Sequence, residues 1–138
     1  MPISSTLHTI FIHIPKNAGE SIERTLDMYG GNPLETFWGV LENRSVLQHL
    51  TAVQVRERLL SDVWDQYFKF AVVRNPWSRA VSEYKWYLRY GTVIPFYEWV
   101  ETLEDRLKIN HAINIYEAGH NVAQHKFVYD AKGNMLVD

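Results

Sequence analysis

Hydrophobic residues along the chain fall into short runs that are separated by polar, turn-forming stretches. Residues 9–14 are rich in β-branched and aromatic side chains and predict a buried strand. Residues 67–73 predict a second buried strand, and residues 45–49 predict a weaker one. Helical patterns follow these runs, so we expect an α/β protein with a mostly parallel sheet and right-handed crossovers. In such a sheet, ligands bind beyond the carboxyl ends of the strands.

Three shorter elements are predicted beside these strands. Apolar spacing predicts a helix over residues 22–29, which the glycines at residues 30–31 end. The sequence Thr-Ala-Val-Gln at residues 51–54 is a capping box, and it predicts a helix that runs to about Leu60. The tail, residues 126–138, predicts a short C-terminal hairpin.

Two longer helices are predicted in the second half of the chain. Asn75 is placed to cap the first of them, Pro76 takes its first position, and Gly91 ends it. The second is predicted from Pro95 to about Leu107. The positions expected to face inward are Trp77, Ala80, Val81, Tyr84 and Leu88 in the first helix, and Phe96, Trp99, Val100 and Leu103 in the second.

The composition is that of an ordinary globular chain, with 138 residues, 46% of them hydrophobic and 22% charged, which is enough for one domain with a buried core. The net charge of −2 argues against a global basic field for nucleic-acid binding. The chain has no cysteine, which excludes disulfides and thiolate metal sites. No run approaches the roughly 20 apolar residues that span a bilayer, and the N-terminus lacks a signal-peptide pattern, so we expect a cytoplasmic chain.

The first candidate site is the segment 13–21, between a predicted strand and a helix start. Backbone N–H groups at a helix start favour an anion. Ala18 and Gly19 let the backbone approach a phosphate, Lys16 supplies a positive charge, and Ser21 supplies a hydroxyl group. The order differs from a Walker A loop, in which the lysine directly precedes the hydroxyl residue. The alternative interpretation is a surface turn with an ordinary lysine.

The second candidate site is the segment 72–82. Arg74 stands at the end of a predicted strand, and Ser82 lies two turns into the helix that follows. A guanidinium group and a hydroxyl group that converge on a phosphate would recognise it by several hydrogen bonds. The alternative is that Arg74 pairs with a local carboxylate and Ser82 only packs.

Together these segments resemble the PAPS-dependent sulfotransferases, particularly the group that contains the carbohydrate O-sulfotransferases; PAPS is 3′-phosphoadenosine 5′-phosphosulfate. Residues 12–21 look like the family's 5′-phosphosulfate loop, and residues 70–79 look like its 3′-phosphate segment. Ser82 matches the family's serine eight residues after the arginine. The resemblance is clearest over residues 9–90, and it returns at residues 124–138, which are similar to a glutamine-containing segment and hairpin of the family.

The resemblance implies a three-layer α/β/α, P-loop NTPase-like fold and transfer of a sulfuryl group from PAPS to a hydroxyl group, on a carbohydrate acceptor. It implies catalytic roles for Lys16, beside the leaving phosphate, and for His49, as the general base. The residues implied to bind PAPS or its product PAP are Pro15, Lys16, Asn17, Ala18, Gly19, Glu20, Ser21, Arg74 and Ser82. A capping or core role is the alternative for His49.

Two departures from the family pattern keep other functions open. Glu20 stands where the family commonly has threonine, and the chain stops at Asp138, where members usually continue. We therefore expect one sulfotransferase-like domain over residues 1–138 that is shortened at its C-terminus. The alternative functions are a non-catalytic module that binds PAP or a partner, and a P-loop-type kinase. The alternative to a cytoplasmic location is that the chain is a soluble fragment of a Golgi-type enzyme.

The remaining candidate residues have weaker interpretations. His13 is expected to pack, and the spacing of His111, His120 and His125 indicates no metal site. Lys85 and Arg89 share a helical face with Ser82 and either guide an anionic acceptor or form a solvated basic face. An aromatic cluster either stacks on a ligand or belongs to the core or an interface; its members are Trp86, Tyr87, Tyr90, Phe96, Tyr97 and Trp99.

Overall fold

The computed structural model describes residues 3–28, 47–91, 93–105 and 120–138. The strands are β1 (Ile3–Ser4), β2 (Thr9–Ile12) and β3 (Phe68–Ala71). The α-helices are α1 (Gly19–Thr25), α3 (Ala52–Arg56), α4 (Ser61–Gln66), α5 (Pro76–Tyr87) and α6 (Phe96–Glu101). Single 3₁₀ turns are η1 (Leu47–His49), η2 (Leu88–Tyr90) and η3 (Gln124–Phe127). The predicted mixed α/β class is confirmed.

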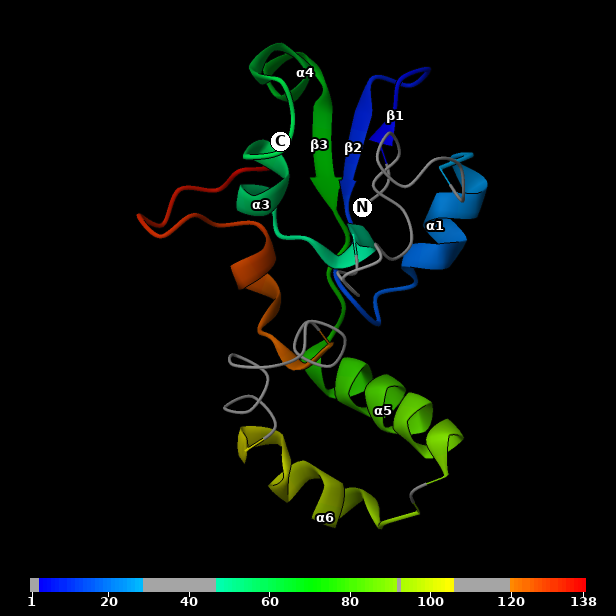
Figure 1. The fold of residues 1–138 in the computed structure, drawn as a ribbon. Helices are drawn as coiled ribbons and strands as arrows, with labels where there is room; N and C mark the ends of the chain where they lie inside the picture. Colours follow the sequence, from blue (N-terminus) through cyan, green and yellow to red (C-terminus); the bar gives the residue numbers. More distant parts are fainter. Residues whose placement is uncertain (1–2, 29–46, 92, 106–119) are drawn as a thin grey trace.

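A small sheet in the order β1-β2-β3 forms the centre of the fold (Figure 1). Strand β2 pairs with β3 in parallel, with Ile10 opposite Lys69, and pairs with β1 in an antiparallel arrangement. Because side chains alternate along a strand, Ile10 and Ile12 share one face of β2 and Phe11 takes the other. The sheet therefore contains both kinds of pairing in its described part, and both faces of β2 are buried.

The two faces of β2 pack against different parts of the chain. The isoleucine face belongs to a buried cluster formed by Ile10, Ile12, Ile14, Leu47, Leu50, Ala52, Val55, Trp64, Phe127 and Val128. On the other face, the ring of Phe11 stacks on that of Phe70, with 4.9 Å between the ring centroids. His13 continues this face and forms a hydrogen bond with Glu23 of α1. Figure 1 accordingly shows α1 and α3 on opposite sides of the strands.

Helices α5 and α6 lie beyond the carboxyl ends of β2 and β3 (Figure 1). Helix α5 starts where the sequence predicts, because the side chain of Asn75 accepts hydrogen bonds from the N–H groups of Trp77 and Ser78. The capping box at Thr51 and Gln54 is also confirmed by both of its hydrogen bonds. Sequence-local hydrogen bonds therefore fix where both helices begin.

The burial predicted for α5 is wrong for two of its five inward positions, whereas Ala80, Tyr84 and Leu88 are half-buried. Trp77 is 80% exposed and Val81 is 40% exposed, whereas Arg79 and Glu83 are buried. The guanidinium group of Arg79 donates to the carbonyl oxygens of Pro15, Val122 and His120 at 2.8–3.0 Å. Because these hydrogen bonds compensate for lost hydration, this helix buries a polar stripe that its apolar spacing does not reveal.

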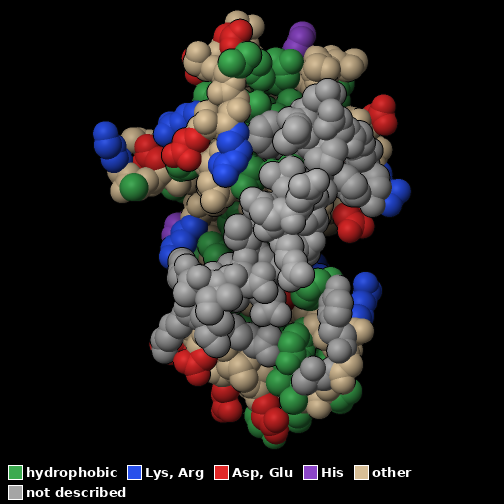
Figure 2. Space-filling model, viewed as in Figure 1, with side chains coloured by type: hydrophobic (Ala, Val, Ile, Leu, Met, Phe, Trp, Pro, Cys, Tyr) green, Lys and Arg blue, Asp and Glu red, His purple; other side chains and the backbone are tan. Residues whose placement is uncertain are grey.

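Helix α6 packs on α5 through aromatic side chains. Trp99 is 1% exposed, and its ring lies 5.6 Å from that of Tyr84 and 5.9 Å from that of Phe96. Phe96 and Val100 keep about 40% of their surface exposed, so only part of the predicted inward face is buried. Figure 2 shows acidic side chains on the outer surface around α6, which carries Glu98 and, just beyond its end, Glu104 and Asp105. The predicted end at Leu107 lies outside the described residues.

Other predicted elements differ from the structure. The weak strand at residues 45–49 is wrong for its described part, since Leu47–His49 form η1 and bring Leu47 and Leu50 into the core. The first part of the tail is η3, and the hairpin is reduced to an antiparallel bridge between Tyr129 and Met135. Strand β1 and helix α4 have no counterpart in the prediction. Within the described part of the chain, no helix is long and apolar enough to cross a membrane.

Candidate active site

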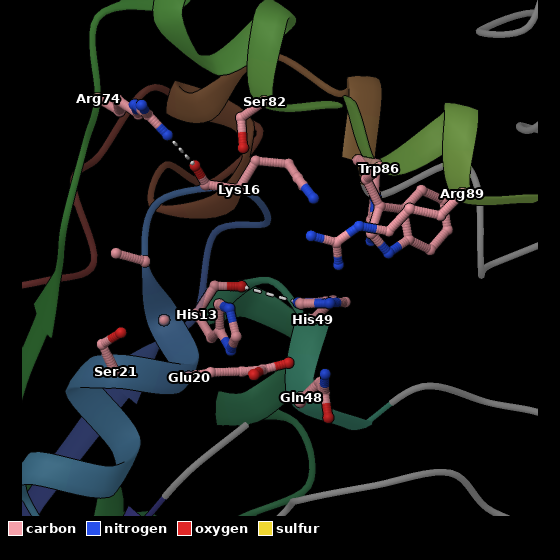
Figure 3. A pocket seen from close by; sticks show the side chains of 13 residues that line it. His13, Lys16, Glu20, Ser21, Gln48, His49, Arg74, Ser82, Trp86 and Arg89 are labelled. Atoms are coloured by element: carbon pink, nitrogen blue, oxygen red, sulfur yellow. Dashed lines mark hydrogen bonds between the residues drawn. The ribbon is translucent and has the colours of Figure 1, made fainter. Parts of the chain in front are cut away.

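A pocket of about 490 Å³ lies where the segments after β2 and β3 meet the body of α5 (Figure 3). Its lining residues are His13, Lys16, Ala18, Gly19, Glu20, Ser21, Gln48, His49, Arg74, Ser82, Trp86, Arg89 and His120. They come from the end of β2 and the loop after it, from the first turn of α1, from η1, from the segment after β3, from α5 and η2, and from the segment before η3. The position agrees with the expectation that ligands bind beyond the carboxyl ends of the strands.

The loop between β2 and α1 has an unusual backbone. Lys16 and Ala18 have φ angles of 68° and 62°, in the left-handed region that residues other than glycine seldom adopt. Asn17 lies between them, is buried, and donates from Nδ2 to the carbonyl oxygen of Val72 and to Oε1 of Gln124, both at 2.7 Å. Left-handed residues in a tight loop can turn successive backbone N–H groups toward one concavity, which binds anions. Tertiary hydrogen bonds through Asn17 hold this conformation in place.

Gln124 joins the two predicted phosphate segments. Its Oε1 accepts from the N–H of Arg74 at 2.9 Å as well as from Asn17, and its Nε2 donates to the carbonyl oxygen of Arg74 at 2.8 Å. The Arg74 side chain in turn donates from Nη1 to the carbonyl oxygen of Lys16 at 3.4 Å. These bonds bring Lys16 and Arg74 to one pocket although 58 positions separate them in sequence.

Lys16 is the most enclosed cation of the pocket. Its side chain is 15% exposed, and its Nζ lies 4.0 Å from Oε2 of Glu83 and 5.3 Å from the centroid of the Trp86 ring. Burial lowers the pKa of Lys16 below its ordinary value, and the Glu83 carboxylate opposes that shift. Figure 3 shows the side chains of Lys16 and Arg89 extending into the same space.

Two histidines line the pocket beside the loop. The Nδ1 of His13 forms a 2.5 Å hydrogen bond with Oε1 of Glu23, in a buried pair. His49 is half-buried, and its Nδ1 donates to the carbonyl oxygen of His13 at 3.2 Å. A carbonyl oxygen only accepts, so Nδ1 of His49 carries the proton and Nε2 keeps a free lone pair.

The surroundings of His49 favour its neutral form. Burial is the largest cause that holds the pKa of His49 well below 6.5, and the neighbouring rings of His13 and His120 act in the same direction. The centroids of these two rings lie 4.6 Å and 5.4 Å from that of His49. At neutral pH, His49 is therefore a neutral imidazole at the wall of the pocket, with Nε2 able to accept a proton.

The comparison with known proteins agrees with this geometry. Residues 3–134 match the sulfotransferase family. The chain belongs to the sulfotransferase family. No curated protein and no solved structure matches it. Membership indicates an enzyme that transfers a sulfuryl group, and sulfotransferases generally take that group from PAPS and pass it to a hydroxyl-bearing acceptor.

This sulfotransferase brings most of the predicted site residues together. The ones that line the pocket are Lys16, Ala18, Gly19, Glu20, Ser21, His49, Arg74 and Ser82. Pro15 and Asn17 are buried residues of the same loop and are not part of the lining. The carbonyl oxygen of Pro15 accepts from Arg79, and the amide of Asn17 donates to Gln124. In Figure 3 the Glu20 side chain extends toward Gln48, on the far side of the pocket from Lys16.

Other pocket residues were missed or ranked low from the sequence. Trp86 and Arg89 follow Ser82 by four and seven positions, so they lie on the same helical face as Ser82. This spacing is the sequence signal that identifies both residues as part of the pocket lining. Lys85 is exposed and is not part of the lining. His120 has no such local signal, because only tertiary structure brings it to His49. Among the described residues, no group of three His, Cys, Asp or Glu side chains is arranged to hold a metal ion.

The shifted pKa of His49 predicts a pH-dependent stability. Because the folded pKa lies below the unfolded value of about 6.5, the unfolded chain binds this proton first as the pH falls. The contribution of His49 is therefore fully present above about pH 6.5. It is lost on acidification toward the folded pKa, at up to about 1.4 kcal/mol per pH unit.

Urea unfolding at several pH values between 5 and 8 measures this effect. We expect His49→Gln to flatten the pH dependence of the unfolding free energy below pH 6.5, relative to the parent chain. His125→Gln is the matched control, since His125 is exposed on η3. An unchanged pH dependence in His49→Gln would contradict the assignment of the low pKa to this histidine.

Proposed function

We propose that this chain is a PAPS-dependent sulfotransferase that transfers the sulfuryl group to a hydroxyl group of a carbohydrate. The observation that carries the proposal is the convergence of Lys16, Arg74 and Ser82 on one pocket beside the neutral imidazole of His49. Two cations and a hydroxyl fit a ligand with phosphate groups at both ends, and a neutral histidine fits proton removal from an alcohol. The pocket volume lies in the range of nucleotide-sized ligands.

The residues divide naturally between the two ends of the donor. In the proposed complex, Arg74 and Ser82 hold the 3′-phosphate, because a guanidinium group and a hydroxyl group supply several donors to one phosphate. Lys16 and the backbone from Ala18 to Ser21 hold the 5′-phosphosulfate. The location of Glu20 on the Gln48 side supports this division, since its carboxylate extends away from Lys16 (Figure 3).

The proposed chemistry uses one base and one cation. Nε2 of His49 accepts the proton of the acceptor hydroxyl while the new oxygen–sulfur bond forms. The bond between sulfur and the phosphate oxygen breaks, its electron pair stays on the phosphate of PAP, and the ammonium group of Lys16 offsets the added negative charge. The proton leaves His49 for water after the products dissociate, which the low pKa of His49 favours.

We also infer the finer features of the fold. Helices on both faces of β2 support a three-layer α/β/α, P-loop-like arrangement of one domain over residues 1–138. The carbohydrate acceptor rests on the resemblance to the carbohydrate O-sulfotransferases, and the indole of Trp86 in the pocket wall supports it, because sugar rings stack on aromatic faces. The cytoplasmic location stays a prediction from the sequence.

Calorimetric titration with PAP tests the donor site. We expect PAP to bind in preference to AMP, ADP and ATP, and Arg74→Ala to weaken PAP binding roughly 10- to 100-fold, since a hydrogen-bonded charge contributes about 1.5–3 kcal/mol. Arg56→Ala on α3 is the control, because Arg56 is exposed and outside the pocket lining. Equal affinity of Arg74→Ala and the parent chain would refute the assignment of the 3′-phosphate site.

A non-catalytic PAP-binding module is the second candidate, and Glu20 is the observation that favours it. A carboxylate in the pocket lining repels an anionic donor unless it is turned away or protonated. Selective PAP binding without sulfate transfer to any member of a glycan panel supports this candidate, and any labelled sulfated product excludes it. A preference for ATP over PAP would instead indicate a P-loop-type kinase.

A further inference from the structure

A buried carboxylate lies behind the pocket, one residue beyond Ser82 on α5. Glu83 is 5% exposed, and its Oε2 forms a 2.9 Å hydrogen bond with Nδ1 of His120. The same oxygen lies 4.0 Å from Nζ of Lys16. One carboxylate oxygen therefore lies close to two side chains that line the pocket.

Burial of a carboxylate is unfavourable unless cationic or hydrogen-bonding partners compensate for lost hydration. Arg79, one turn earlier on α5, is buried with Glu83 and donates to the carbonyl oxygen of His120 at 2.8 Å. Arg79 thus fixes the backbone of His120, while Glu83 fixes its imidazole ring. The polar stripe of α5 orients a residue that arrives from a segment about 40 positions away in sequence.

We propose that Glu83 is a positioning residue that directs the ammonium group of Lys16 and the imidazole ring of His120 toward the bound donor and acceptor. The inference rests on the proposed sulfotransferase function and adds a residue outside the pocket lining to its machinery. Glu83 acts through Lys16 and His120 and does not touch the substrates.

The charges around Lys16 make Glu83 important for its protonation. Arg89 on η2 and Arg74 after β3 both disfavour the ammonium form, and Glu20 on α1 favours it together with Glu83. Glu20 is exposed, so water screens its charge, whereas the burial of Glu83 leaves its field on Lys16 largely unscreened. Glu83 therefore opposes both the burial of Lys16 and the two arginines, and it raises the pKa of the Lys16 ammonium group.

The contact with His120 fixes the tautomer of that ring. Because the Glu83 carboxylate accepts from Nδ1–H, the neutral imidazole of His120 keeps its lone pair on Nε2. The ring lies 5.4 Å from that of His49 and 4.7 Å from that of Trp86, between centroids. In this orientation His120 offers the pocket a hydrogen-bond acceptor next to His49, suited to a hydroxyl group of the acceptor.

Trace labelling of lysines with acetic anhydride at a series of pH values measures the titration of Lys16 without any substrate. We expect Glu83→Gln to shift the titration of Lys16 to lower pH than in the parent chain, because the isosteric amide removes the opposing negative charge. Exposed Lys85 is the internal reference, and Glu101→Gln on α6 is the matched control. An identical Lys16 titration in Glu83→Gln and Glu101→Gln would overturn the proposal.

Turnover separates positioning from a purely structural role. We expect Glu83→Gln to lower kcat on the order of 100-fold with a smaller change in KM for PAPS, since displaced catalytic groups lose rate more than binding. The alkaline limb of its pH–rate profile should move to lower pH, because Lys16 loses its proton earlier. Glu83→Asp keeps the charge and is expected to leave that limb near its parent position while kcat falls. A lower kcat with no movement of the limb in Glu83→Gln would indicate a structural role only.

A measurement on the unsubstituted chain covers the case in which Glu83→Gln fails to fold. Imidazole ¹⁵N spectra should show His120 with its proton on Nδ1, and the opposite tautomer would overturn the proposal. PAP titration of the same sample tests the proposed function separately. If the chain does not bind PAP but His120 has the expected tautomer, the proposed donor site is refuted and the arrangement at Glu83 stands. If the chain binds PAP but His120 has the opposite tautomer, only the inference about Glu83 is refuted.

Discussion

Lys16→Ala is expected to lower the rate of sulfuryl transfer from PAPS on the order of 1000-fold, with a much smaller loss of stability. The cation lies in a partly buried pocket, where a charge stabilises developing negative charge far better than in water. Loss of one such preorganised group typically costs 10²–10³ in kcat. The backbone conformation should survive, because alanine tolerates the left-handed φ of this position about as well as lysine does.

Labelled-sulfate transfer to a glycan panel, at saturating PAPS, measures this loss. Lys85→Ala is the matched control, since Lys85 lies on α5 but is exposed and outside the pocket lining. We expect the control to keep the parent rate. Transfer by Lys16→Ala at the parent rate would show that the leaving phosphate is stabilised elsewhere, and the role proposed for Lys16 would have to be withdrawn.

Gly19→Ala is expected to destabilise the chain by about 1–3 kcal/mol, the usual cost of overpacking a rigid site. It should also weaken PAP binding, because Gly19 belongs to the pocket lining. A Cβ atom at this position would overlap the imidazole ring of His13. That ring has little freedom to move, because it is bonded to Glu23, stacked on Phe11 and in edge contact with His49. The first turn of α1 and the backbone proposed to bind phosphate must shift instead.

A double-mutant cycle isolates this steric cause. His13→Ala alone loses the buried pair with Glu23, but it opens the space that the new methyl group needs. We therefore expect Gly19→Ala to cost much less in the His13→Ala background, as measured by urea unfolding, and the two changes to be clearly non-additive. Additive losses, or full PAP affinity in Gly19→Ala, would show that the loop accommodates the methyl group without displacing the ring.

The sequence alone located the parts of the site that depend on local structure. The apolar run before Pro15 and the capping residues Asn75 and Thr51 are local signals, and each produced an element at the expected place. Lys16 and Arg74 were predicted because residues at the ends of adjacent parallel strands share one edge of a sheet. The pairing of β2 with β3 satisfies that condition.

The predictions failed where long-range contacts outweigh local pattern. Helix α5 buries Arg79 and Glu83 in place of Trp77 and Val81, because hydrogen bonds to distant backbone carbonyls and to His120 compensate the polar side chains. The segment at residues 47–49 resembles a strand, yet it forms a 3₁₀ turn that packs Leu47 into the core. The spacing of apolar residues predicts which face of a helix is buried only when polar side chains on other faces lack buried hydrogen-bond partners.

By itself, the sequence determined the α/β class, the starts of α3 and α5, and the residue types of the two predicted anion-binding segments, because each depends on neighbours within a few positions. Only the tertiary structure decided which side chains share the pocket. Gln124 ties the loop at Asn17 to Arg74, and Glu83 meets both Lys16 and His120. These contacts join positions that are 37 to 107 residues apart, and no local pattern encodes a pairing over such distances.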